Sequence, residues 1–418
     1  MVKSPEDGGG QGDATVDIRT AIENRISRER AKALLIELVR VPSPQTERFE
    51  AEPLLARFIR EAVEPRLRAM GIADIRYDAM SNLIATHGEN VTGRSLMLIG
   101  NAMNQPQSTM KNAYAGDVDD GAKYGLPGEI VLGKGASEQK ANLAAMLHAM
   151  EVVIGAGLPV RGRLHFVCCT SGETGRHDAI RSVVEGEGVR ADMAVLGGTS
   201  LKLTLGNRGR IDVFIRVKGA PCHSSAPHKG CNAITGAIEV IRRLTTELPL
   251  PGNHPALGKP TLAINHIRSL PDSTHTIQGE CAITVDRRLL PGDDPDAAFE
   301  AIRKLAMQVD GMKDPPSGLP WRIEVKQGPF MYPSLVTTDS PVVKLIGEAA
   351  SAMLGAPPET FYTTTAFDQG YLNHMGIPCA NYGCGEDRFA HTDQDCASVD
   401  RTADTARVFA WMIAHYLG

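Results

Sequence analysis

The stretch GKGASEQKANLAAMLHAMEVVIGAG (133–157) contains a glycine-rich turn, one acidic residue at Glu138 and a long apolar run. The length and pattern of this run predict a helix. Apolar runs typical of strands precede it at 95–100 (SLMLIG) and follow it at 162–169 (GRLHFVCC). Strands that alternate with helices of ten or more residues are typical of an α/β fold, in which the site lies at the carboxyl ends of the strands.

The remaining pattern divides the chain into a tail, two segments of one domain and an insert. Residues 1–20 are polar and glycine-rich, which predicts a disordered tail. Residues 21–204 and 331–418 form the predicted α/β catalytic domain, with a central mixed sheet flanked by helices. The insert at 205–330 predicts an α+β lid or dimerisation domain of ordinary size. Within and beside it, 203–219 (LTLGNRGRIDVFIRVKG) has the pattern of paired strands.

Composition narrows the class of partner. The chain has 418 residues and a formal net charge of -5, so it has no electrostatic footprint for nucleic acid or an anionic membrane. Its 8 cysteines form no C-x-x-C pair and no apolar run approaches the roughly 20 residues of a membrane span. We therefore expect a cytoplasmic protein with free thiols and a small-molecule substrate.

Polar residues that could carry chemistry gather in five stretches, which follow predicted strands, occupy glycine-rich turns or lie in the insert. These are GNAMNQPQ (100–107), GKGASEQKANLAAM (133–146), TSGETG (170–175), GAPCHSSAPHKGCNA (219–233) and GCGEDRFAHTDQD (383–395). Side chains placed at the ends of strands and in turns can converge on one site.

At several of these places the chain resembles the zinc aminoacylase and glutamate carboxypeptidase-like amidohydrolases. The resemblance rests, in this order, on GKGASEQK, GAPCHSSAP, Asn232, DRRLLPGDD, FDQG and AHTDQD, and it runs from about Glu29 to the C-terminus. The family includes succinyl-diaminopimelate desuccinylase and acetylornithine deacetylase. It implies a catalytic α/β domain interrupted by a lid or dimerisation domain, and two zinc ions bridged by one acidic residue.

Carried over residue by residue, the resemblance preserves one metal position and removes the other. The bridging acid falls on Glu138, the second glutamate ligand on Glu173 and the C-terminal histidine on His391. Asn101 stands in place of the other ion's histidine, and Gly198 in place of its acid. Two carboxylates, one imidazole and an open position suit a catalytic metal. We expect one divalent cation, zinc or alternatively manganese or cobalt, with a metal-free site as the alternative.

The general base is the weak point of this assignment. Gly172 occupies the place of the family's base, so proton transfer needs another group. Glu173 is the base if the register slips by one residue, and His177 and Asp178 are the other candidates. Asn101 can donate and accept hydrogen bonds, and we expect it to hold substrate or water where an ion is lost.

The insert supplies the candidates for substrate contact. His223 matches a family histidine that reaches the partner subunit's site and hydrogen-bonds the scissile carbonyl as an oxyanion donor. Arg288 matches a family arginine and can bind a carboxylate as a bidentate fork, with an ion pair to Asp286 as the alternative. Arg268 suggests an acidic or planar substrate group, unless it is simply exposed to solvent. Asn232 is a further substrate-binding candidate.

Structural explanations compete with several of these roles. Glu138 could be an acid that stabilises the start of a helix, and His391 could be a core histidine. Cys222, Cys384 and Cys396 lie in or near the motifs, but small buried thiols explain them better than a nucleophile does, because no thiolate-stabilising partner is evident.

These residues predict a metal-dependent hydrolase of a C–N bond, in an amide, carbamoyl or related group of a small carboxylated substrate. The reduced metal site predicts one ion rather than two, and the lid predicts a homodimer. One alternative is a metal-independent hydrolase or lyase that uses glutamate and histidine as acid and base. Another is a non-catalytic, ligand-binding relative.

Overall fold

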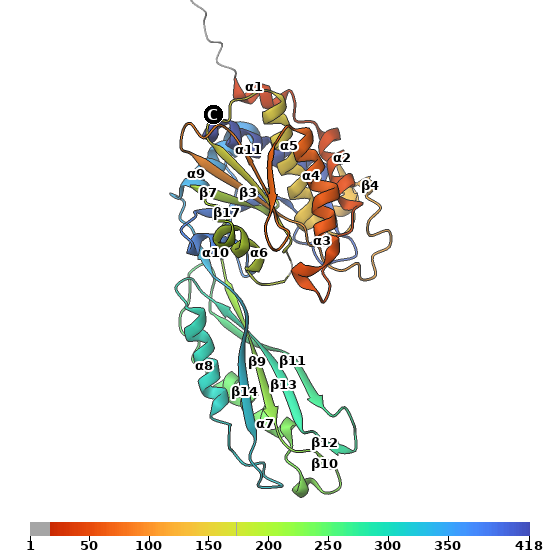
Figure 1. Cartoon of the computed structure of the whole chain (residues 1–418), viewed down its shortest axis with the longest axis vertical. Coiled ribbons are helices and arrows are strands. Elements are labelled where there is room, and N and C mark those ends of the chain that lie inside the picture. Colours follow the sequence, from red (N-terminus) through yellow and green to blue (C-terminus); the bar gives the residue numbers. More distant parts are fainter. Residues whose placement is uncertain (1–16, 173) are drawn as a thin grey trace, which may run out of the picture.

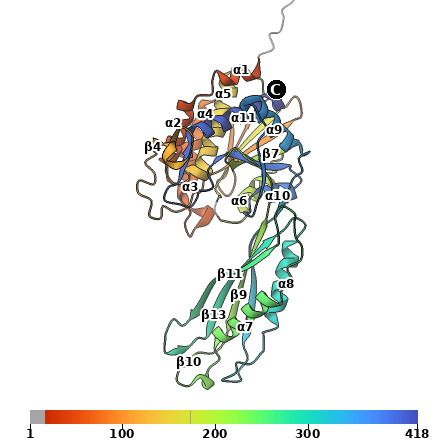
Figure 2. The same cartoon turned by 180° about the vertical axis from the view of Figure 1, so that it is seen from behind.

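The computed structural model describes residues 17–172 and 174–418. Figure 1 shows a catalytic domain of sheet and helices above an elongated lid, and the view from behind in Figure 2 shows the same separation. Of the predicted tail, residues 1–16 lie outside the described part, and residues 18–20 belong to helix α1 (Ile18–Glu23). No helix in the described part of the chain is long and apolar enough to cross a bilayer.

The catalytic domain is built on a mixed sheet of 9 strands in the order β1-β2-β6-β3-β7-β17-β8-β15, with β16 beside β8. The central strands β6, β3, β7 and β17 are parallel, so their carboxyl ends meet at one edge. The bounds are β1 (Asp74–Tyr77), β2 (Leu83–His87), β3 (Ser95–Asn101), β6 (Arg163–Cys169), β7 (Met193–Thr199), β8 (Leu203–Asn207), β15 (Ser334–Leu335), β16 (Thr360–Thr363) and β17 (Cys379–Gly385).

Helices cover both faces of this sheet, which confirms the predicted α/β class. One face packs against α2 (Arg28–Val39), α5 (Ala141–Gly155), α9 (Pro341–Leu354) and α11 (Val399–Leu417), with α3 (Pro53–Phe58) and α4 (Glu64–Ala69) at its margin. The other face packs against α6 (Asp178–Arg181) and α10 (Gln369–His374). Helix α5, the helix of the opening stretch, is buried along most of its length because it lies between the sheet and α11.

A small sheet joins two stretches that are far apart in the sequence. It consists of β4 (Asp117–Asp120), β5 (Glu129–Leu132) and β18 (Cys396–Ser398), with β5 in the middle. Strand β5 leads directly into the GKGASEQK turn, and β18 follows the AHTDQD stretch. Antiparallel pairing of Leu132 with Cys396 therefore brings the two motifs together at one end of this sheet.

The lid is a four-stranded antiparallel sheet with helices on one face and its own core. The strand order is β11-β13-β9-β14, and β10 and β12 form a short pair at the tip farthest from the catalytic domain (Figures 1 and 2). The bounds are β9 (Gly209–Lys218), β10 (Cys222–His223), β11 (Thr261–Leu270), β12 (Thr276–Ile277), β13 (Glu280–Leu289), β14 (Arg322–Met331), α7 (Ala233–Thr246) and α8 (Pro295–Met307).

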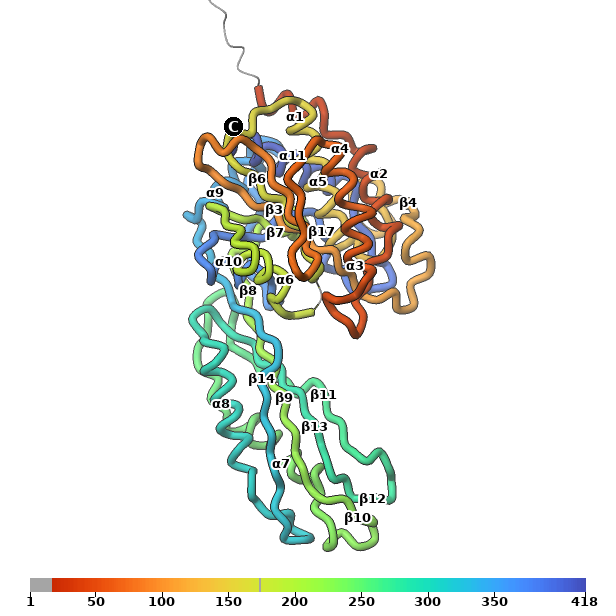
Figure 3. The backbone as a smooth tube through the Cα atoms, viewed as in Figure 1, coloured from red at the N-terminus to blue at the C-terminus, as the bar shows by residue number. Residues whose placement is uncertain are grey.

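The stretch 203–219 was predicted as paired strands, and this prediction is wrong. Strand β8 pairs with β17, β15 and β16 of the catalytic sheet, whereas β9 pairs with β13 and β14 of the lid. The chain thus crosses between the domains here and returns after β14, as Figure 3 shows. The crossing is close: a Cβ on Gly209 would lie 2.5 Å from the carbonyl oxygen of Met331.

A fully buried lysine beside the GKGASEQK turn couples stability to pH. The Lys140 ammonium donates to the carbonyl of Val41 (3.0 Å) and lies over the rings of Phe58 (5.2 Å) and Tyr114 (5.3 Å). Burial lowers the pKa of Lys140 to about 7, against an opposing effect of the Asp395 carboxylate. Because the unfolded chain keeps this proton up to about pH 10, the folded state binds fewer protons between pH 7 and 10.

We predict that the free energy of unfolding of the wild type rises from pH 7 to pH 9 relative to that of Lys140→Met. The relative slope should approach roughly 1.4 kcal/mol per pH unit, the value for one proton. Urea unfolding of both proteins at pH 7, 8 and 9 measures it. Parallel pH profiles would show that Lys140 keeps an ordinary pKa in the folded protein.

Candidate active site

A cavity of about 610 Å³ lies at the carboxyl edge of the central strands, where the lid joins the catalytic domain. Its walls come from the ends of β3, β7 and β17, from the turn 136–140 that precedes α5, and from the base of the lid strands β9 and β13. Among the predicted site residues described by the structure, those that line it are Asn101, Glu138, Arg288 and His391.

Glu138 and His391 are brought into direct contact. The Glu138 Oε1 atom lies 3.2 Å from the His391 Nε2 atom, although 253 residues separate them in sequence. His391 has a φ of 62°, a left-handed conformation unusual for a non-glycine residue, which marks a locally constrained backbone. Two ligands of one tetrahedral ion lie roughly 3.3 Å apart when their bonds are about 2.0 Å, so this pair has the spacing of two metal ligands.

The third predicted ligand, Glu173, lies outside the described residues. Within 17–172 and 174–418, no group of three or more histidine, cysteine, aspartate or glutamate side chains is arranged to hold a metal. The described residues thus supply one carboxylate, Glu138, and one imidazole, His391. This donor set fits a divalent cation once a further ligand is added.

The buried carboxylate of Asp395 holds the two halves of this pair in place. It accepts hydrogen bonds from the backbone N–H groups of Gly135 (2.7 Å) and Ser137 (2.8 Å), in the turn that carries Glu138. Burial raises the pKa of Asp395, while the two N–H donors act in the opposite direction. Because Asp395 lies four residues after His391, its side chain links the AHTDQD stretch to the GKGASEQK turn.

At Gly198 and Gly172, where the family has acidic residues, neighbouring backbone atoms leave no room for a side chain. A Cβ on Gly198 would lie 2.7 Å from the backbone nitrogen of Tyr382, and a Cβ on Gly172 would lie 2.7 Å from the carbonyl oxygen of Met103. Neither position can take a carboxylate unless the backbone opposite moves. Asn101 lines the cavity, and its Oδ1 atom is buried with no hydrogen-bond partner among the described residues.

His177 is not available as a general base. Its Nδ1 atom lies 2.7 Å from the Asp368 carboxylate, and its Nε2 atom accepts a hydrogen bond from the backbone N–H of Tyr332 (2.9 Å). Its side chain is fully buried, so both ring nitrogens have structural partners. Asp178 begins helix α6, does not line the cavity and lies 3.8 Å from Arg176. The two alternatives to Glu173 therefore lose support.

Three guanidinium groups line the side of the cavity nearest the lid. Arg288 on β13 and Arg210 on β9 are cross-strand neighbours, and both contact Asp286, at 2.9 Å and 3.2 Å. Arg210 also forms a bidentate pair with Asp212 (2.9 and 2.8 Å). Arg176, which follows the TSGETG stretch, is the third.

The sequence analysis did not select Arg210 or Arg176. Only a weak signal was present for Arg210: like Arg288, it has an aspartate two residues away in its strand, Asp212 after Arg210 and Asp286 before Arg288. Arg288 forms the ion pair with Asp286 that was the alternative to substrate binding, and it also lines the cavity.

The other lid candidates lie away from this cavity. His223 is in β10 at the tip of the lid (Figure 1), and Arg268 is exposed on the edge strand β11. The Asn232 side chain caps helix α7 by accepting from the backbone N–H of Ile234 (3.0 Å). The structure thus gives Asn232 a helix-capping contact, and Arg268 and His223 can reach a site only in another subunit.

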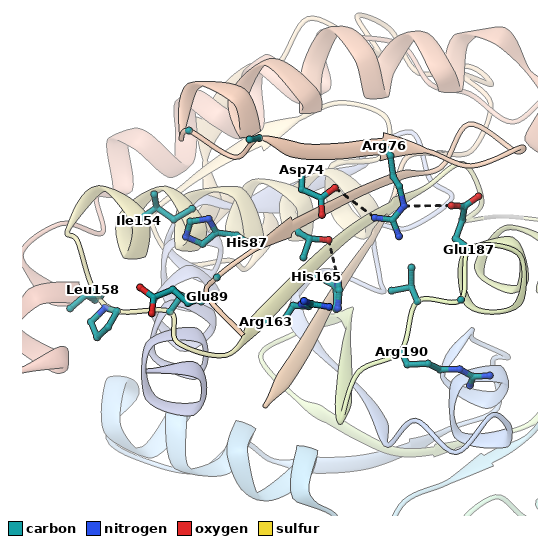
Figure 4. Close-up of a pocket in the computed structure, with 18 of the residues that line it drawn as sticks. Asp74, Arg76, His87, Glu89, Ile154, Leu158, Arg163, His165, Glu187 and Arg190 are labelled. Carbon is teal, nitrogen blue, oxygen red and sulfur yellow. Dashed lines mark hydrogen bonds and ion pairs between the residues drawn. The ribbon is translucent and has the colours of Figure 1, made fainter. Parts of the chain in front are cut away.

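A larger hollow of about 1010 Å³ lies elsewhere, on the outer strands β1, β2 and β6 (Figure 4). Three of its charged groups are paired, since Arg76 lies 3.8 Å from Asp74 and 3.5 Å from Glu187, and His165 lies 3.3 Å from the hydroxyl of Thr86. We place the candidate site in the smaller cavity, because that cavity holds the motif residues.

All 8 cysteines are free thiols, and all except Cys222 are buried. Burial raises the pKa of Cys384 and of Cys396 to about 12. Neither thiol is activated as a nucleophile, since the thiolate is the reactive form.

Comparison with known proteins gives matches along most of the chain. The peptidase dimerisation domain matches residues 205–311. Succinyl-diaminopimelate desuccinylase of Phenylobacterium zucineum is 26% identical over 373 residues, which cover 85% of this chain and 92% of that protein. The uncharacterized protein YgeY of Escherichia coli is 26% identical over 377 residues, 86% of this chain and 88% of its own length.

Solved structures share the fold. An M20 family metallo-carboxypeptidase from Sulfolobus solfataricus superimposes with a TM-score of 0.73 at 16% identity, over 92% of this chain and 99% of the other. Human carnosine dipeptidase 1 gives a TM-score of 0.71 at 15% identity, over 96% and 98%. With the dimerisation-domain match and the desuccinylase match, these likenesses show that the chain is similar in sequence to the desuccinylases and shares its fold with the M20-type peptidases.

Proposed function

We propose that the protein hydrolyses the C–N bond of an amide, carbamoyl or related group in a small carboxylated substrate. Hydrolysis of amide bonds in small substrates is the activity indicated by the names of the desuccinylase, the carboxypeptidase and the dipeptidase. The observation that carries the proposal for this chain is the contact of 3.2 Å between Glu138 and His391 in a cavity whose opposite side presents guanidinium groups.

A single divalent cation is part of this proposal, with zinc first and manganese or cobalt as alternatives. Glu138 and His391 would hold it, with Glu173 as the third ligand by sequence register. Bound there, it supplies Lewis-acid polarisation of the scissile carbonyl. Asn101 and Gly198 leave no charged ligand for a second ion on the adjoining strands.

The arginines of the lid would orient the substrate. Arg288 is held by Asp286 and still lines the cavity, so its remaining N–H groups can bind a substrate carboxylate. Arg210 beside it adds a second guanidinium. Water adds to the carbonyl carbon, the C–N bond breaks, and the departing nitrogen takes a proton. We assign the proton transfer to Glu173. This residue is the third ligand in the register given above, and it is the base if the register slips by one residue.

We further propose a homodimer in which each lid completes the partner's site. His223 accepts a hydrogen bond from the backbone N–H of Ser225 at Nδ1 (3.2 Å), so the neutral ring carries its proton on Nε2, where it can serve as an oxyanion donor. The edge strand β11 exposes Ile267 (52%) and Leu270 (42%), as expected of a surface that pairs with another copy. The free thiols support a cytoplasmic location.

Two other functions remain as outcomes of the tests. A metal-independent hydrolase or lyase would use Glu138 and His391 for acid–base chemistry, which their direct contact permits. A non-catalytic protein would use the same cavity to bind a ligand. The first is distinguished by turnover that is insensitive to chelators, the second by binding without turnover.

We predict about one divalent cation per chain and chelator-sensitive hydrolysis of N-acyl or N-carbamoyl amino acids. Glu138→Gln and His391→Ala should each lower kcat/KM by about 10²-fold or more, because Lewis-acid catalysis is worth several kcal/mol. Metal analysis and a substrate panel, before and after chelation, measure this. Asp393→Asn, an exposed acid two residues from His391, is the matched control. Full turnover of chelated protein would refute the metal's role.

We predict that subunit exchange between two inactive variants restores activity. His223→Ala and His391→Ala each abolish a different part of every site, but a mixed dimer keeps one intact site. Random exchange should restore about a quarter of wild-type activity, since half of the dimers are mixed and each has one working site. Steady-state rates of the mixture report it, with each variant alone as control. No recovery despite demonstrated exchange would rule out a shared site.

A further inference from the structure

We propose that the wall of the cavity left without metal ligands is a subsite for a neutral amide-like group of the ligand, a carboxamide or a ureido group. This inference rests on the proposed function, because it concerns the same cavity. It assigns a role to Asn381, which lies outside the motifs, and to Ser171 of the TSGETG stretch, which has no part in the metal position, and it places Asn101 with them.

The side chains of Asn101 and Asn381 lie on one face of the sheet. In a strand, residues two apart point to the same side. Asn101 follows Ile99 by two residues, and Asn381 follows Cys379 in the same way. Ile99 and Cys379 belong to the core between the sheet and α6 and α10, as does Cys169, two residues before Ser171. Asn101 and Asn381 therefore continue this core face into the cavity, and Ser171, which follows the end of β6, lines the cavity with them.

Register fixes where the two amides stand relative to each other. Leu196 of β7 is paired with Ile99 on one side and with Asn381 on the other. Strands β3 and β17 are thus two spacings apart, about 9.6 Å. At the next level of β7 stands Gly198, which has no side chain. Asn381 is level with Leu196, and Asn101 is two residues further along, level with Gly198. The two amides therefore lie on either side of β7, offset by two residues along it, and both line the cavity.

Each of these side chains has a buried polar atom that lacks a partner. Among the described residues, no hydrogen bond reaches the Asn101 Oδ1, Asn381 Oδ1 or Ser171 Oγ atoms. Asn381 and Ser171 are each only 2% exposed. Buried polar groups are paired in the great majority of cases, so three such atoms on one cavity wall indicate a ligand group that pairs with them. Whichever way an amide is turned, one of its polar atoms occupies this place.

The chemistry of the wall selects a neutral ligand group. The two amides and the hydroxyl carry no net charge, so they offset neither a cation nor an anion taken out of water. The Asp368 carboxylate also lines the cavity, but it is already engaged by the buried His177 ring at 2.7 Å. Each amide offers both a donor and an acceptor, and a carboxamide or ureido group offers the same combination in return. The ligand carboxylate would then lie on the opposite side, at Arg288 and Arg210.

The test compares two ligands of almost equal shape, N-carbamoylglycine and N-acetylglycine, which differ by an NH₂ in place of a CH₃. Dissociation constants are measured by titration calorimetry on chelator-treated protein, in which the proposed hydrolysis is arrested, so the result reports binding alone whether or not the protein is an enzyme. We expect the wild type to bind N-carbamoylglycine about tenfold or more tightly than N-acetylglycine, because a site that pairs with N–H groups rejects the analogue without them.

Asn381→Leu, which is similar in size, should remove this preference and retain the binding of N-acetylglycine. Gln369→Met is the matched control, because Gln369 is a fully buried amide with an unpartnered oxygen that does not line the cavity. If Asn381→Leu does not fold, Ser171→Ala provides the same comparison with a smaller change. Equal affinities in the wild type, no binding of either ligand, or a preference that survives Asn381→Leu would overturn the proposal.

Discussion

The carboxylate of Asp395 fixes the distance on which the candidate chemistry depends. Its hydrogen bonds from the backbone N–H groups of Gly135 and Ser137 tie the segment between His391 and β18 to the turn that carries Glu138. The Lys134 ammonium adds a hydrogen bond to the carbonyl of Thr392 (2.6 Å). Strands β5 and β18 continue this pairing into regular structure. The contact between Glu138 and His391 is therefore a consequence of backbone geometry, which a flexible loop could not maintain.

Glycine positions in this site are packing requirements as well as missing functional groups. At Gly198 and Gly172 an added Cβ would collide with backbone atoms of β17 and of the 103 region. A single substitution to aspartate or glutamate would thus strain the strand before it supplied a ligand. The departure from a two-metal site extends beyond the side chains to the backbone around them. We therefore interpret this as a stable site with a different set of residues, and not as a two-metal site that has recently lost its ligands.

Much of the architecture could be predicted from the sequence, because it follows from local periodicity. The long apolar pattern of 140–157 became α5, and the apolar runs beside it became β3 and β6. The separate lid also followed from a change in pattern. The assignment of β8 failed because two strands joined by a short connection usually pair, whereas here the connection crosses between domains. Only long-range partners determine which sheet such a strand joins.

The candidate site was predictable where it depends on motifs and unpredictable where it depends on register. Glu138 and His391 could be found from local sequence, but their contact requires the small sheet that joins distant segments. Arg210 and Asn381 have no local signal strong enough to identify them. Each gains its position from a neighbour across a strand, Arg288 in one case and Leu196 in the other. Pairing partners of this kind are a property of the folded chain.

The distribution of charge across the cavity constrains how a ligand can lie in it. On the lid side, Asp212 and Asp286 hold Arg210 and Arg288 in fixed orientations and offset part of their charge. Burial raises the pKa of Asp212, and the adjacent guanidinium groups favour its ionised form. On the sheet side Asn101, Asn381 and Ser171 are uncharged, and the Asp368 carboxylate is engaged by His177. A ligand with one carboxylate and one neutral polar end would lose hydrogen bonds and face an unpaired guanidinium if it were reversed, so charge alone selects one orientation. In that orientation the bond between the two ends would pass the Glu138 and His391 pair, where the chemistry is proposed.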